Sequence, residues 1–334
     1  MDRSPGLRAA PRGGVAGALA GATGWFNSAP LTAPDLHGRV VLIDFWTYTC
    51  INWLRSLPYL RAWAGRYRRR GLAVVGVPTP EFGFEHDLGN VQRAVEDLRV
   101  GFPVAIDNDY AIWGAFANQY WPALYLVDAQ GQRRHHRFGE GDYERSERII
   151  QQLLDEAGAH DGADDPSDDL SEVDARGVEA AADWDSMRSP ENYLGYGRTE
   201  NFASSGPVLD RPSGYAIPVR LRLNEWALAG EWTVQRDAVG QDQPGARIAC
   251  RFHARDLHLV LAPATPGIPV RFRITIDGRP PGAAHGSDAD GDGEGTVSQA
   301  RLYQLVRQPG PVSERTFEIS FLDPGVRAFA FTFG

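Results

Sequence analysis

The chemistry open to this chain centres on one cysteine. Cys50 follows an apolar, β-branched run, Val40 to Trp46, which predicts a buried strand. Apolar residues then recur every three or four positions, which predicts a helix with one face turned inward. They are Trp53, Leu54, Leu57, Leu60, Ala64 and Tyr67. Cys50 thus begins a helix, where unpaired N–H groups and the positive end of the helix dipole stabilise an anion. A thiol there loses its proton more easily than a free cysteine, whose pKa is about 8.5, and the resulting thiolate is the nucleophile. A buried structural cysteine is the other interpretation.

The residues around Cys50 match a known pattern. Asp44 ends the predicted strand six residues before the cysteine, Trp46 precedes it by four, and Pro58 follows it by eight. A proline inside a helix removes a backbone hydrogen bond, so its position is specific. The segment resembles the active site of the thioredoxin superfamily, in its redoxin or TlpA-like branch. The resemblance implies a helix kinked at Pro58 and a site lined by Asp44, Trp46 and Trp53.

One departure from that family concerns its second cysteine. The family carries Cys-x-x-Cys, whereas Trp53 stands three residues after Cys50 here. Without a second thiol at that position, chemistry at Cys50 must pass through a mixed disulfide or a sulfenic acid that another molecule resolves. The family's buried acid moves protons for the missing thiol. Asp44 is therefore either an inherited structural residue or a group that tunes Cys50 through a water.

A second signature follows at Tyr120 to Asp128, where Pro122 begins a predicted strand. The resemblance implies a cis bond between Trp121 and Pro122, with the proline beside the reactive sulfur. The Trp121 backbone would then meet a bound peptide, which pairs as an added strand. A trans proline at a strand start is the alternative.

Other residues near the cysteine leave two alternatives open. Thr47 and Thr49 precede it, and Thr-x-x-Cys also fits peroxiredoxins, which reduce peroxide with one sulfur; the proline expected seven residues before the cysteine is Ile43 here. A one-cysteine peroxidase, an antioxidant activity, is therefore the secondary expectation. Glu81 and Glu85 follow a parallel strand, on the sheet edge where α/β sites gather, although both could equally be solvated.

Composition bounds the functional classes. The length of 334 residues predicts two domains, and nine tryptophans are ample for their cores. The net charge of −9 argues against a nucleic-acid surface. Two cysteines exclude a disulfide scaffold. Residues 1–23 contain three arginines followed by an apolar part that is nearly all Gly and Ala, which predicts a flexible leader, with a secretion signal as the minority interpretation. No apolar stretch is long enough for a membrane span, so a cytoplasmic location is favoured over an exported or periplasmic one.

The elements that position Cys50 alternate between strands and helices. This alternation over residues 24–157 predicts an α/β thioredoxin-like domain with a central mixed sheet flanked by helices, one of them at 85–100. An acidic stretch opens a predicted linker at 158–188. Residues 189–334 then show short alternating segments without a convincing helix, which predicts a β-sandwich of jelly-roll type. The predicted strands lie at 219–223, 227–235, 247–253, 257–261, 270–276, 301–306, 316–321 and 328–333.

This order of domains carries a second resemblance. The segments at 189–198, 251–257 and 321–325 resemble a carbohydrate-binding-module-like β-domain. A redoxin followed by such a domain is similar to the soluble module of DipZ-type cytochrome c biogenesis proteins. The resemblance covers residues 24–334 and implies a thiol or disulfide partner, with a glycan or protein ligand for the β-domain as an open option. The membrane-spanning part of those proteins is not encoded in this sequence.

Residues of the β-domain offer weaker candidates. Cys250 lies in a predicted strand and is expected to pack in the core. Asp288, Asp290 and Asp292 have the spacing of a calcium loop, but Gln299 stands where the bidentate carboxylate should be, so a surface loop is preferred. Trp226 and Trp232 fit either glycan binding or core packing. No cofactor is predicted.

Two functional hypotheses follow. In the first, the chain is a single-cysteine thiol oxidoreductase acting on disulfides or peroxides, with a small thiol or a protein as resolving partner. In the second, it is a non-catalytic binding module, in which Trp53 and Pro122 line a peptide groove and Cys50 is incidental. Substrate, reductant and oligomeric state do not follow from the residues.

Overall fold

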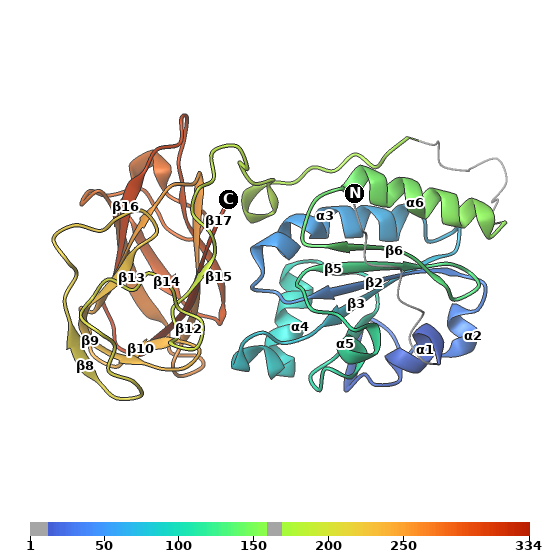
Figure 1. The fold of residues 1–334 in the computed structure, drawn as a ribbon, viewed down its shortest axis with the longest axis horizontal. Helices are drawn as coiled ribbons and strands as arrows, with labels where there is room; N and C mark the ends of the chain where they lie inside the picture. The colour runs from blue at the N-terminus through green and yellow to red at the C-terminus, as the bar shows by residue number, and fades with distance from the viewer. Residues whose placement is uncertain (1–12, 159–168) are drawn as a thin grey trace, which may run out of the picture. The chain divides into compact units, whose positions relative to one another are not determined.

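The computed structural model describes residues 13–158 and 169–334. The chain divides into two compact units, Met1–Glu179 and Ala180–Gly334, and each is described by itself (Figure 1). The first twelve residues and most of the predicted acidic stretch lie outside the described part. Within that part, no helix is long and apolar enough to cross a membrane.

The first unit is built on a six-stranded mixed sheet in the order β1-β4-β3-β2-β5-β6. β2 pairs with β3 and β3 with β4 in parallel, whereas the other three pairs are antiparallel. The strands are β1 Gly24–Phe26, β2 Val40–Trp46, β3 Leu72–Pro78, β4 Val104–Ile106, β5 Ala123–Val127 and β6 Arg133–Phe138. The predicted thioredoxin-like class, a mixed sheet flanked by helices, is confirmed.

Helices cover both faces of this sheet (Figure 1). They are α1 Gly14–Leu19, α2 Ala33–Leu36, α3 Ile51–Arg66, α4 Leu88–Asp97, α5 Ala111–Phe116 and α6 Tyr143–Glu156. The odd-numbered core residues of β2 pack in one cluster with α1, α2 and α5. Because successive strand residues point to opposite faces, the even-numbered residues, among them Asp44 and Trp46, face α3 and α6.

The expected flexible leader needs a correction. Residues 14–19 form α1, and Val15, Ala18 and Leu19 are buried in the core under the sheet. A Cβ at Gly21 would lie 2.8 Å from the Cβ of Ala111, so the small side chains let this segment pack closely against α5. A Gly- and Ala-rich composition predicts flexibility, but in this fold it permits close contact.

The predicted helix at 85–100 is interrupted. A 3-10 turn, η1 Gly83–His86, comes first, and α4 begins only after Asp87, whose Oδ1 accepts from the N–H of Asn90 at 2.9 Å as an N-cap. The helical period covers both parts, so the sequence pattern did not reveal the break.

The end of the predicted linker is attached to the first unit. Ser171 donates from its N–H and its hydroxyl to the Glu147 carboxylate, at 3.0 and 2.6 Å. The 3-10 turn η3, Gly177–Glu179, packs on α3, where Glu179 pairs with Arg61 at 2.6 Å. This part of the linker is therefore bound rather than simply solvated.

The second unit is an antiparallel sheet of eleven strands that curls around one core. Its path is β14-β13-β16-β11-β9-β10-β17-β12-β15, with β7 on β17 and β8 on β9. The strands are β7 Asn192–Tyr193, β8 Ser213–Tyr215, β9 Trp226–Val234, β10 Val239–Gln241, β11 Arg247–Phe252, β12 Asp256–Pro263, β13 Val270–Ile276, β14 Glu294–Val297, β15 Arg301–Arg307, β16 Arg315–Phe321 and β17 Val326–Phe333. The predicted all-β sandwich class is confirmed.

Strand prediction in this unit was incomplete. The segment 219–223 alternates like a strand but pairs with none, and Val219 is fully exposed. The short strands β7, β8, β10 and β14 were not predicted. Segments of two to four residues carry too little alternation to be distinguished from loops.

Candidate redox site at Cys50

Cys50 is the N-cap residue of α3 and its side chain is partly exposed. Its carbonyl oxygen accepts from the N–H groups of Trp53 and Leu54, at 3.1 and 3.0 Å, and its own N–H donates to the Thr47 carbonyl at 3.1 Å. The thiol therefore stands at the positive end of the helix and is reachable from solvent. Both conditions favour attack by a thiolate.

Trp53 fills the position of the family's second cysteine with a buried indole. Its Nε1 donates to Oδ2 of Asp44 at 2.8 Å, and its ring stacks on Trp46 with centroids 4.1 Å apart. None of these three side chains is more than 2% exposed. The stack requires Gly76 on β3, because a Cβ there would lie 2.8 Å from the Trp46 Nε1. Trp53 therefore joins α3 to β2 and leaves no thiol within the motif to pair with Cys50.

Asp44 is the most perturbed acid of the site. Burial raises its pKa to about 8, although the hydrogen bond from Trp53 acts in the opposite direction. The carboxyl group is therefore mainly protonated at neutral pH. Of the two roles open to Asp44 from the sequence, the contact with Trp53 supports the structural one.

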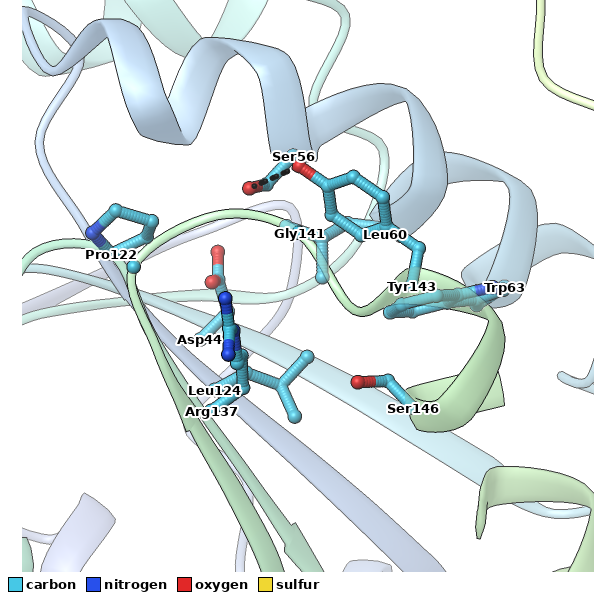
Figure 2. A pocket seen from close by; sticks show the side chains of 11 residues that line it. Asp44, Ser56, Leu60, Trp63, Pro122, Leu124, Arg137, Gly141, Tyr143 and Ser146 are labelled. Carbon is cyan, nitrogen blue, oxygen red and sulfur yellow. Dashed lines mark hydrogen bonds between the residues drawn. The ribbon is translucent and has the colours of Figure 1, made fainter. Parts of the chain in front are cut away.

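A small cavity adjoins Asp44 (Figure 2). Its volume is about 20 Å³, room for about one water, and its lining includes Ser56, Pro122, Arg137 and Tyr143. The hydroxyls of Ser56 and Tyr143 are hydrogen bonded at 3.2 Å. Cys50 is not among the described lining residues, so a water here would serve Asp44 rather than the thiol. Sequence reasoning missed Ser56, Arg137 and Tyr143, which come from three different elements without any common spacing.

Glu85 anchors the loop that carries Cys50. The hydroxyl of Thr47 and that of Thr49, the latter at 2.6 Å, both donate to its Oε1. Its Oε2 accepts from the backbone N–H groups of Glu81 and Phe82, at 2.6 and 3.0 Å. Burial raises the pKa of Glu85 to about 6, and these hydrogen bonds oppose the rise. One buried carboxylate thus ties the loop before Cys50 to the loop after β3.

This arrangement changes the assignment of three predicted residues. Thr47 and Thr49 are buried and face Glu85, and Glu81, the acid expected at the site, contributes its backbone N–H to the same carboxylate. No spacing in the segment from Glu81 to Asp87 separates Glu85 from its charged neighbours, so only the fold identifies it.

The second signature lies beside the first. The Trp121–Pro122 bond is cis, as the resemblance implied. β2 and β5 pair Phe45 with Ala123, and one further step of this register places Pro122 opposite Trp46. The Trp121 indole donates from Nε1 to the Thr79 carbonyl at 3.0 Å, which fixes the ring at the end of β3.

The candidates of the second unit are structural. Cys250 is 3% exposed, and burial raises its pKa to about 12. Trp226 and Trp232 are buried in the core, which corrects the glycan-binding interpretation of these two rings. Asp288 pairs with Arg301 at 2.6 Å, and Asp290 accepts from the N–H groups of the following turn. Among the described residues, no group of three His, Cys, Asp or Glu side chains could hold a metal ion, so the calcium option finds no support.

Comparison with known proteins agrees with this geometry. Residues 189–334 match the family described as "Thioredoxin like C-terminal domain". Protein DipZ of Mycobacterium bovis is 37% identical over 270 residues, which are 80% of this chain and 37% of DipZ. The chain is a thioredoxin-superfamily module similar to DipZ. It spans little more than a third of the length of that curated relative.

Shorter relatives match about two fifths of the chain. Thiol-disulfide oxidoreductase YkuV of Bacillus subtilis is 28% identical over 138 residues, 41% of this chain and 93% of YkuV. A solution structure of a thioredoxin-like protein in the oxidized form aligns at 29% identity with a TM-score of 0.37, and covers 40% of this chain and 90% of that one. The relatives of this DipZ-like module therefore include thiol-disulfide oxidoreductases.

Proposed function

We propose that the chain is a thiol–disulfide oxidoreductase that works with a single cysteine, Cys50. The observation that carries the proposal is the contrast between the two positions of the motif. Cys50 is partly exposed at the start of α3, whereas Trp53 is buried and donates a hydrogen bond to Asp44. The remaining cysteine, Cys250, is enclosed in the core of the other unit.

The proposed reaction proceeds by thiolate exchange. The Cys50 thiolate attacks one sulfur of a partner disulfide, a mixed disulfide forms, and the partner's other sulfur leaves as a thiolate. An external thiolate then attacks the Cys50 sulfur and releases the partner's first sulfur. A second external thiolate frees Cys50 and leaves the external thiol as its own disulfide. The partner gains two electrons, and two external thiols lose them.

The arrangement of Thr47 favours disulfides over peroxides as substrates. In the peroxidase interpretation, the threonine three residues before the cysteine belongs to the reaction centre. Here its hydroxyl donates to Glu85, which makes it part of the loop anchor. A binding module without redox activity is the competing function, and it predicts that Cys50 can be replaced without loss.

The test uses Cys50 as the only thiol. We expect the folded Cys250→Ala variant to form one mixed disulfide per chain with oxidised glutathione. Intact mass spectrometry should detect this adduct, and dithiothreitol should reverse it. We also expect the variant to accelerate the reduction of insulin disulfides by dithiothreitol. The matched control, Cys50→Ala with Cys250 retained, should do neither.

Two results would reject the proposal. One is a native chain in which Cys50 reacts with glutathione disulfide only after denaturation. The other is full insulin reduction by the Cys50→Ala control, which would assign the activity elsewhere.

A further inference from the structure

The first unit contains a large cavity that the redox site does not use. Its volume is about 700 Å³, which falls in the size range of small-molecule sites. The wall combines the C-terminal half of α3, the start of β3 and the segments 27–31 and 99–103. Gly65 on this wall lies about 22 Å along the α3 axis from Cys50, at 1.5 Å per residue. The cavity is therefore separate from the cysteine.

The charged residues described around this cavity are all positive. Arg39, Arg61, Arg68 and Arg99 line it, and none of the lining residues that the structure describes is acidic. This concentration of guanidinium groups contrasts with the net charge of −9 of the whole chain. Arginine forks match the oxygens of phosphate and carboxylate groups, so the wall is suited to an anion.

Two of the four arginines are held in place by the protein. Arg39 donates to the carbonyl of Leu72 at 3.0 Å, and Arg61 donates to the carbonyl of Leu98 at 2.7 Å. Arg61 also pairs with the Glu179 carboxylate at 2.6 Å, so one lining guanidinium already binds a carboxylate supplied by η3. Fixed groups of this kind lower the entropy lost on binding.

The other two arginines keep their donors available. Arg68 and Arg99 are exposed, and their guanidinium groups form no ion pair or hydrogen bond within the described residues. Arg99 has a φ of 52° and follows Leu98, the C-cap of α4, at the position where glycine is the usual residue. Ser28 adds a lining hydroxyl that is buried and makes no hydrogen bond in the described part of the chain. The lining also contains an apolar group, called the floor below: Leu31, Leu72, Ala73, Val74, Phe102 and Pro103.

We propose that this cavity binds a small organic diphosphate. Arg61 already pairs with Glu179, so the guanidinium groups of Arg39, Arg68 and Arg99 are the ones that can bind a ligand. Three positive charges suit a compact ligand group that carries several negative charges. The apolar floor provides a place for an organic substituent, which inorganic anions lack. This site does not depend on the reaction proposed for Cys50.

The test is calorimetric titration of the full chain with ADP and with pyrophosphate, at about 0.15 M salt to screen long-range attraction. We expect ADP to bind more tightly than pyrophosphate, and the Arg68→Gln/Arg99→Gln variant to weaken ADP binding about tenfold or more, as expected for lost charge-assisted hydrogen bonds. The control, Arg69→Gln/Arg148→Gln, removes the same charge from exposed arginines outside the lining and should bind like the wild type. Glu179→Gln should bind more tightly, because it frees Arg61.

Three results would overturn this inference: no binding of ADP at millimolar concentration, equal weakening by both double variants, or equal affinity for ADP and pyrophosphate. The rate of glutathione adduct formation at Cys50 should be unchanged in all these variants. A failure here is thereby distinguished from a failure of the redox proposal.

Discussion

The protonation of Asp44 provides the sharpest quantitative test of the site. Replacing Asp44 by Asn removes the titrating group but keeps an oxygen that accepts from the Trp53 indole. In the wild type, burial raises the pKa of this carboxyl group from its ordinary value of 3.8 to about 8. The folded protein therefore holds a proton that the unfolded chain releases.

The sign and size of the effect follow from this difference. A raised pKa contributes stability below the ordinary value, and this contribution is lost as pH rises toward the folded value. Between pH 5 and pH 8 the folded state keeps its proton while the unfolded state does not. At 1.36 kcal/mol per pH unit, the wild type should lose about 4 kcal/mol relative to Asp44→Asn over this interval.

The assay is urea unfolding followed by circular dichroism at pH 5, 6, 7 and 8. The quantity of interest is the free energy of unfolding of Asp44→Asn minus that of the wild type at each pH. This difference cancels the second unit and every other titrating group. Asp109→Asn, at an exposed aspartate of the same unit, is the matched control for the loss of one carboxyl group.

A flat difference would refute the reasoning. If Asp44→Asn and the wild type lose stability in parallel from pH 5 to pH 8, then Asp44 is ionised in the folded protein. The raised pKa of Asp44 given above would then be wrong.

Three further predictions concern the same contacts. Trp53→Phe keeps an aromatic ring but loses the hydrogen bond to Asp44, and should lower the free energy of unfolding by about 1–3 kcal/mol in urea titrations. In an Asp44→Asn background the same substitution should lower the free energy of unfolding by a different amount, because the two residues are coupled. The amide of Glu85→Gln cannot accept the four hydrogen bonds that the carboxylate accepts. Hydrogen exchange in the loop before Cys50, measured by mass spectrometry, should therefore become about tenfold faster, while exchange in the second unit should not change. Iodoacetamide at pH 9 should label Cys50 and leave Cys250 unmodified until urea unfolds the chain, since burial excludes the reagent and raises the pKa of Cys250 to about 12; rapid native labelling of Cys250 would contradict its core position.

Local patterns were sufficient for much of the fold. The apolar run of β2 and the three-to-four spacing of α3 depend only on neighbours in the chain, and together they located Cys50 at a helix start. The alternation in the second half identified most long strands, because each has one face in the core. Resemblance added the position of Pro122.

Local patterns misled where contacts between distant segments decided the outcome. Residues 14–19 appeared as a flexible leader because their composition is small and weakly apolar, yet they pack under the sheet. The segment 219–223 alternates correctly but has no neighbouring strand, and a strand needs a partner for its backbone groups.

By itself, the sequence determined that a cysteine begins a helix after a buried strand and that no second thiol follows at the family's spacing. Only the tertiary structure decided what replaces that thiol: Trp53 reaches across to Asp44, and Glu85 reaches back to Thr47 and Thr49. The physical reason is that a hydrogen bond between elements depends on how their faces pack and on which side chains are desolvated together. Neither quantity is recorded in the spacing of residues along one segment.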